Sequence, residues 1–156
     1  MKLKLIAIGN KLPAWIEEGI QDYQKRLPKN IHFQLLTPNA KKRTKNTSTK
    51  KNIDIESEIL LETSQGSSKI IALDERGKHR TTKQFADKIK DWQQNDEKVS
   101  FLIGGADGHN NKLKQTADEI WSISDFTLPH GIARLVMVEQ IYRAISLLNN
   151  HPYHRE

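Results

Sequence analysis

Apolar residues fall into five short runs, separated by longer segments in which apolar positions return every three or four residues. The run at residues 98–105 is almost entirely apolar toward its end, as expected for a strand that is covered on both faces. Runs of this kind predict β-strands. We therefore expect strands at residues 2–9, 31–37, 69–74, 98–105 and 119–124.

The segments between these runs have the spacing of amphipathic helices. Pro13 opens the first helix, in which Ile16, Ile20 and Tyr23 follow helical spacing. The sequence TTKQ at 81–84 fits a capping box and predicts the start of another helix. The last helix is unusually apolar, which indicates burial on two sides, against the sheet and against a second subunit. The later helices are expected at about 53–63, from 81 past 92, at 112–117 and at 132–149.

The alternation of strands and helices predicts an α/β fold with a mainly parallel sheet and helices on both faces. A length of 156 residues suits a single domain, residues 1–156. In such sheets, ligands bind beyond the carboxyl ends of the strands. Three unusual loops follow three different strands and are expected to surround one ligand there: residues 73–78, 103–109 and 124–131.

The composition narrows the class of protein. The chain is 36% apolar and has no cysteine, which excludes disulfides, thiolate metal sites and cysteine nucleophiles. No stretch approaches the ~20 apolar residues of a membrane span. The apolar run at the N-terminus is too short for a secretory signal. We expect a soluble, cytoplasmic protein.

Positive charge is concentrated in one part of the chain, whose net charge is +6. No acidic residue occurs between Asp22 and Asp54, whereas nine basic residues lie there. This concentration suits binding to a phosphate backbone, but a solvated loop that keeps the protein soluble explains it equally well. The stretch 39–52 lacks hydrophobic periodicity and is expected to be a mobile loop. Its candidate RNA-binding residues are Lys41, Lys42, Arg43 and Lys45.

The glycine-rich segment FLIGGADGHN, residues 101–110, fits no standard nucleotide motif. A dinucleotide fingerprint needs glycine at the position of Ile103, and no phosphate-binding P-loop pattern occurs. Zinc-protease spacing of histidines and the G-x-S-x-G elbow are also missing, so no metal and no serine triad is expected. The glycines indicate either a tight strand-to-helix turn or a close approach to a ligand.

The C-terminal sequence HPYHRE, residues 151–156, combines residue types that suit RNA. Tyrosine can stack on a base, arginine can hold phosphate, and histidine titrates near neutrality. Chain ends are usually frayed and dispensable, which is the plainer interpretation. On the preceding helix, Arg143 has a plain alternative too, an ion pair with Glu139 four residues earlier.

Five motifs in order resemble one family, the SPOUT-class methyltransferases that modify N3 of a pseudouridine in large-subunit ribosomal RNA. The motifs are LDERGK, FLIGGADG, TLPHGIAR, EQIYRA and the terminal PYHRE. The resemblance begins at MKLKLIAIG and extends to the last residue. The basic stretch KKRTKN also lies where the family is basic.

The resemblance implies S-adenosylmethionine as cofactor, a C-terminal trefoil knot, and a homodimer whose site is completed across the interface. It implies a pseudouridine of 23S ribosomal RNA in the assembled ribosome as substrate. The implied cofactor contacts, where glycines let the backbone approach the ligand, are Leu73, Gly104, Gly105, Ile123, Ser124, Asp125, Phe126, Thr127 and Leu128. The implied catalytic or substrate-side residues are His130, Arg143, Tyr153, His154 and Arg155.

Three positions depart from the family pattern. His109 replaces an expected aliphatic residue, Gly131 falls at a variable position, and Asp125 adds a charge to the cofactor stretch. In the implied mechanism a neutral His154 takes the N3 proton. Two alternatives stay open: a non-catalytic RNA-binding or ribosome-associated module, and a methyltransferase for another RNA position.

Overall fold

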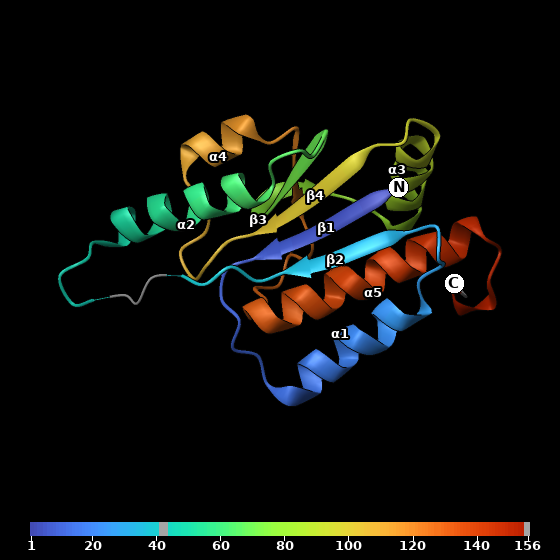
Figure 1. Ribbon diagram of the computed structural model, residues 1–156, viewed down its shortest axis with the longest axis horizontal. Helices are drawn as coiled ribbons and strands as arrows, with labels where there is room; N and C mark the ends of the chain where they lie inside the picture. The colour runs from blue at the N-terminus through green and yellow to red at the C-terminus, as the bar shows by residue number, and fades with distance from the viewer. Residues whose placement is uncertain (41–43, 155–156) are drawn as a thin grey trace.

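The computed structural model describes residues 1–40 and 44–154 (Figure 1). Strands and helices alternate along these residues, as the sequence predicts. The elements in chain order are β1 (Lys2–Ala7), α1 (Ala14–Arg26), β2 (His32–Leu36), α2 (Thr49–Thr63), β3 (Lys69–His79), α3 (Thr82–Gln94), β4 (Lys98–Ile103), α4 (Asn111–Thr116), β5 (Glu119–Ser122), α5 (His130–Leu148) and the 3₁₀ helix η1 (Pro152–His154).

The five strands form one sheet in the order β2-β1-β4-β3-β5, and every neighbouring pair is parallel. The predicted α/β fold with a parallel sheet is confirmed. Strand β3 is longer than the sequence indicates, because its polar end pairs with β5 again beyond an irregularity between Leu73 and Lys78. All five strands point the same way, so the loops that follow them meet at one edge of the sheet.

One face of the sheet is covered by α1, α3 and α5, which lie over strands that alternate inward-facing apolar residues. Four aromatic rings fill its centre, with Phe85 packed edge-on against Trp121 at a centroid distance of 5.4 Å. Trp92 stacks on Trp121 at 6.0 Å, and Phe101 packs against Phe85, Trp92 and Trp121. This cluster fixes α3 on the sheet.

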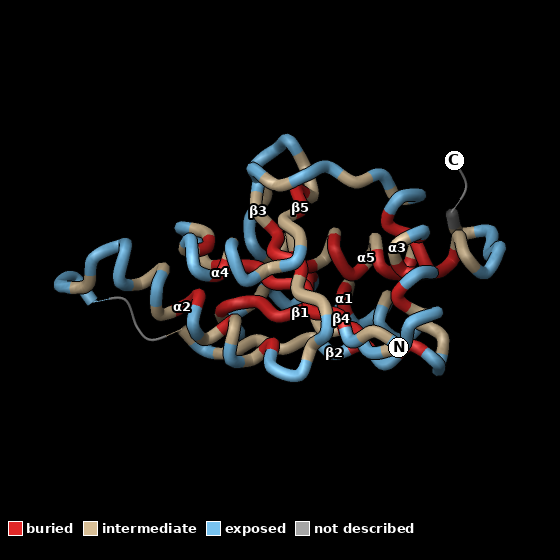
Figure 2. Tube along the Cα trace, turned by 90° about the horizontal axis from the view of Figure 1, so that it is seen from above, coloured by how far each residue is buried: buried red, intermediate tan, exposed pale blue. Residues whose placement is uncertain are grey.

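The opposite face carries α2 and α4, which lie near the arrowheads of β1 and β4 in Figure 1. Leu60 of α2 and Leu113 of α4 pack against Ile6, Ala72 and Leu102, of which Ile6 and Leu102 lie in the carboxyl halves of their strands. Figure 2 shows buried segments within the strands and α5, and exposed ones in the loop before α2 and its first turn.

Helix boundaries differ from the sequence expectation at α2 and α5. Helix α2 begins at Thr49 because the Ser48 hydroxyl accepts a hydrogen bond from the Lys51 N–H and caps it, so residues 49–52 of the predicted loop belong to the helix. Helix α5 begins at His130, directly after Pro129. The predicted capping box at Thr81 is confirmed. Among the described residues, no helix has both the length and the apolar character to span a bilayer.

Candidate functional site

A cavity of about 400 Å³ lies at the carboxyl edge of the sheet. Its walls come from three segments: residues 73–76 in the middle of β3, the loop from β4 to α4, and the loop from β5 to α5. These are the three segments that the sequence predicts to meet around one ligand, although residues 73–78 belong to β3 and not to a loop. The first turn of α5 closes the cavity with His130 and Ala133.

Most of the expected cofactor contacts lie at this cavity. The residues among them that line it are Leu73, Gly104, Gly105, Ile123, Ser124, Phe126, Thr127 and Leu128. Asp125 does not line it. Its carboxylate lies 3.0 Å from the His79 Nε2 atom, and its side chain is 90% exposed. Asp125 therefore links the β5–α5 loop to the end of β3.

The glycines of the β4–α4 loop are required by the packing of the protein itself. A Cβ atom on Gly105 would overlap the carboxylate of Glu56, which reaches the loop from α2. A Cβ atom on Gly104 would lie 3.0 Å from the backbone of Gly108. Gly108 has φ +83 and bonds back to the Gly105 carbonyl through its N–H at 3.1 Å. The tight-turn interpretation thus accounts for all three glycines, because none can carry a side chain without strain or displacement.

His109, the expected aliphatic position, is a buried side chain at the back of the cavity. Its Nε2 atom lies 3.1 Å from the carbonyl oxygen of Leu73, and its Nδ1 atom is buried without a hydrogen-bond partner. Burial lowers the pKa of His109, although the bond to Leu73 and the charge of Asp74 oppose this. A neutral ring that donates from Nε2 therefore joins two walls of the cavity.

Asp74 gives the cavity a fixed negative charge. Burial would raise the pKa of its carboxyl group, but a hydrogen bond from the Arg76 N–H at 2.9 Å and the ammonium of Lys114 at 3.3 Å more than offset this effect. The pKa of Asp74 is therefore lowered, and the group is ionised at neutral pH. Sequence reasoning did not place Asp74 among the candidate site residues. Its place directly after an apolar strand was the signal for a site.

The β5–α5 loop presents an exposed aromatic ring beside the cavity. Phe126 lines the cavity, yet its side chain is 84% exposed, and its N–H donates to the Ser124 hydroxyl at 2.9 Å. An apolar ring in this position has surface available to a ligand or to another chain.

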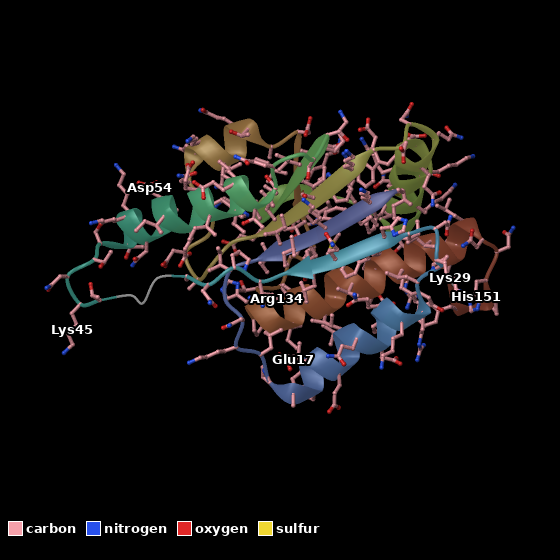
Figure 3. The ribbon with its side chains drawn as sticks, viewed as in Figure 1. Glu17, Lys29, Lys45, Asp54, Arg134 and His151 are labelled. Atoms are coloured by element: carbon pink, nitrogen blue, oxygen red, sulfur yellow. The ribbon has the colours of Figure 1, made fainter. Side chains whose placement is uncertain are left out.

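Arg134 ties α5 to the end of β1. Its guanidinium is buried and donates from Nη1 to the Gly9 carbonyl at 2.8 Å and from Nη2 to the Ile8 carbonyl at 2.6 Å. Burial lowers its pKa. Figure 3 shows Arg134 between the strands and α5, close to the start of that helix. The bond pair fixes the helix end that closes the cavity.

The remaining substrate-side candidates lie at the other end of α5. The Tyr153 hydroxyl donates to Glu139 at 3.0 Å, and Arg143 pairs with the same carboxylate at 2.7 Å. The Arg143 guanidinium also lies 4.9 Å from the centroid of the Tyr153 ring. Tyr23 of α1 and Tyr142 pack against Tyr153. The ion pair anticipated for Arg143 exists, and the tail residue Tyr153 is held in an aromatic cluster.

This cluster is far from the cavity of the same chain. Ten residues separate Ala133, which lines the cavity, from Arg143 on the same helix, which corresponds to about 15 Å. Lys45 is exposed and lies at the end of the molecule opposite His151 (Figure 3). Lys41, Lys42, Arg43, Arg155 and the side chain of His154 lie outside the described residues. Within the described part of the chain, no group of three His, Cys, Asp or Glu side chains is arranged to hold a metal ion.

One family sequence model and several full-length relatives match the sequence of this chain. The sequence model described as "Predicted SPOUT methyltransferase" matches residues 1–154. A protein of Marinomonas sp. (strain MWYL1) named Ribosomal RNA large subunit methyltransferase H is 44% identical over 155 residues, which cover 99% of this chain and 100% of that protein. A protein of the same name from Laribacter hongkongensis (strain HLHK9) is 42% identical over 156 residues, which cover 100% of both.

A solved structure agrees with the fold. It is described as "The structure of a probable methylase family protein from Haemophilus influenzae Rd KW20" and matches with a TM-score of 0.61 at 13% identity. The match covers 95% of this chain and 66% of that chain. The family model spans nearly every residue, and two full-length relatives exceed 40% identity. The chain therefore belongs to the SPOUT methyltransferase family.

Proposed function

We propose that this chain transfers a methyl group from S-adenosylmethionine to large-subunit ribosomal RNA. The observation that carries the proposal is full-length similarity, at 42% and 44% identity, to proteins named for that activity. A cavity between three loops at the carboxyl edge of a parallel sheet supports it, because ligands of such sheets bind there. The finer proposal is methylation of N3 of a pseudouridine in 23S ribosomal RNA, within the assembled ribosome in the cytoplasm.

The residues around the cavity suit this cofactor. A volume of about 400 Å³ is typical of small-molecule sites. Leu73, Ile123 and Leu128 offer apolar surface for an adenine ring, and the carboxylates of Asp74 and Glu75 suit positively charged sulfonium and amino groups. When bound, S-adenosylmethionine supplies a methyl group that its positive sulfur has already activated for transfer.

The protein must then hold the target N3 atom in line and remove its proton. We propose that His154 accepts this proton as the methyl group reaches N3. Arg143 or Arg155 stabilises the anion or holds an RNA phosphate, and Tyr153 contacts the RNA beside them. His130 faces the substrate from the cavity wall.

This assignment needs a second copy of the chain. Arg143 lies about 15 Å along α5 from Ala133, which lines the cavity of the same chain, and Tyr153 packs beside Arg143, so neither side chain lines that cavity. We propose a homodimer in which the tail of each subunit completes the cavity of the other. The proposed domain spans residues 1–156, with a trefoil knot in its C-terminal part.

Transfer of labelled methyl from S-adenosylmethionine tests the proposal. Assembled ribosomes and purified ribosomal RNA are the two substrates, both from cells that lack this modification. The expected result is label on a pseudouridine of the ribosome sample alone. Label on a different nucleotide would leave a methyltransferase with another target.

Two further outcomes would contradict the proposal. If neither sample is labelled and calorimetry still detects S-adenosylmethionine binding, the enzyme acts on an RNA outside the large subunit. If the chain binds ribosomal RNA but not S-adenosylmethionine, it is a non-catalytic RNA-binding module.

A further inference from the structure

Part of one sheet face has no helix over it. On β1 and β4, helices α2 and α4 reach only the carboxyl halves of that face, although their apolar cluster extends to Ile70 near the start of β3. On the amino-terminal halves, Lys2, His32, Gln34 and Lys98 are exposed, and Lys4 is half-buried. Parallel sheets are normally covered on both faces, so this opening is a departure that calls for a physical reason.

The exposed residues form a basic row across three strands. Lys2 of β1 is in register with Lys98 on one side and with His32 on the other. Neighbouring strands lie about 4.8 Å apart, so the row spans about 10 Å. Lys4 stands two residues further along β1, on the same face. We call these four residues, Lys2, Lys4, His32 and Lys98, the basic cradle.

No acidic side chain neutralises the basic cradle among residues 1–40 and 44–154: none of its four side chains has an ion pair there. The nearby acids bond elsewhere. Asp96 lies 3.7 Å from the N-terminal amino group, and Glu97 accepts a hydrogen bond from the Ser68 hydroxyl. Like charges directly opposite each other destabilise a sheet. Repulsion among these side chains therefore destabilises the isolated protein, and an anionic partner would remove this repulsion.

The basic cradle is a hollow rather than a flat surface. A depression of about 590 Å³ lies over it, bordered by Gly66 and Ser67 of the loop before β3. Gly66 has φ +80, and an added Cβ atom would meet nothing within 4 Å, so the rim is low and open on that side. An extended chain can enter such a hollow from the open side.

We propose that the basic cradle binds the sugar-phosphate backbone of the RNA substrate, at a second place distant from the methyl-transfer cavity. This inference rests on the proposed function. A row of lysines that form no ion pair within the described part of the chain matches the chemistry of phosphate groups. The side chains exposed in the cradle are polar or charged, which does not suit a membrane surface.

The cradle and the cavity lie at opposite ends of the same strands. Lys98 begins β4 and Ile103, which lines the cavity, ends it, so they are about 17 Å apart. A folded RNA can span this distance. The cradle would thereby add affinity for RNA without touching the nucleotide that is methylated.

The salt dependence of RNA binding tests the proposal. The full-length Lys2→Gln/Lys98→Gln variant is compared with Lys83→Gln/Lys90→Gln, which removes the same charge from exposed positions on α3. Affinity for purified large-subunit ribosomal RNA is measured between 50 and 200 mM salt. The slope of log affinity against log salt should lose about 1.4 to 1.8 units in the cradle variant and stay unchanged in the control. S-adenosylmethionine binding should be equal in both.

Other outcomes separate this proposal from the proposed function. If the wild type and both variants show the same salt dependence of RNA binding and methyl transfer is intact, the proposed RNA binding by the basic cradle is wrong. The proposed methyltransferase activity would then still hold. An equal loss in both variants would also overturn it, because only net charge would then matter. Binding to polyglutamate is measured for the same variants. If the cradle variant no longer binds polyglutamate but keeps the wild-type salt dependence of RNA binding, the partner is an acidic protein. A wild type that neither binds RNA nor transfers methyl would overturn both proposals.

Discussion

The Nε2 atom of His109 lies 3.1 Å from the carbonyl oxygen of Leu73, and this contact joins the loop after β4 to the middle of β3. Both residues line the cavity. An aliphatic side chain at position 109 would fill the space but could not donate this bond. One buried ring therefore joins two walls of the cavity.

Stability should fall in mild acid because of His109. Its pKa is lowered in the folded protein by burial, so the unfolded chain binds the proton more readily. The contribution of neutral His109 is fully present above the unfolded pKa of about 6.5 and is lost as pH falls toward the folded value. Urea unfolding from pH 8 to 5 should show this loss, and His109→Leu should flatten the curve over that range. An unchanged pH dependence in the variant would contradict the prediction.

Gly105→Ala should destabilise the protein and weaken cofactor binding. The added methyl group overlaps the Glu56 carboxylate, and overpacking of this kind costs about 1–3 kcal/mol. Urea denaturation and calorimetric titration with S-adenosylmethionine measure the two effects. Adding Glu56→Ala in the same chain removes the overlap, so Gly105→Ala should cost less in that background than in the wild type. Equal costs in both backgrounds would show that Glu56 is not the obstacle.

Arg134→Met should lower the free energy of unfolding by about 1–3 kcal/mol, because two backbone carbonyls lose their buried donors. Chemical denaturation measures the change. Arg76→Met, at an exposed position, is the control for removing an arginine charge and should stay within about 0.5 kcal/mol of the wild type. Similar losses in both variants would mean that the bonds to Ile8 and Gly9 contribute nothing.

Mixing two inactive variants should restore methyl transfer if each site uses two chains. His130→Ala alters the cavity side, and Tyr153→Ala alters the tail side. After subunit exchange, half of the dimers are mixed and each has one intact site, so activity should approach about a quarter of the wild-type value. A mixture as inactive as its components, with exchange verified by mass spectrometry, would place the tail elsewhere.

Local patterns in the sequence predicted most of the fold. The five apolar runs predicted the strands because most of this parallel sheet is buried, and TTKQ marked the start of α3 because capping depends on a few adjacent residues. Strand segments made of polar residues were harder to predict from the sequence. Strand β3 continues to His79 through pairing with β5, and such a pairing between distant residues leaves no local pattern.

The cavity followed from general rules, since the loops after neighbouring parallel strands must converge. The contacts that shape it did not. Glu56 reaches Gly105 from α2, and Asp125 pairs with His79 rather than lining the cavity. Both contacts join segments far apart in the chain. Some of the residues that the resemblance implies line the cavity in the structure. Others, Arg143 and Tyr153, lie in the cluster toward the other end of α5.

The length of helix α5 is constrained because contacts to other elements hold both of its halves. Arg134 anchors its first turns to β1, and Glu139 anchors its second half to Tyr153. One residue inserted between these anchors would turn the second half by about 100° and move it about 1.5 Å along the axis. The tail cluster would then face a different direction from the cavity. The length of the helix sets the distance and the angle between the cavity and the tail cluster. Insertions or deletions there should therefore be more harmful than most substitutions.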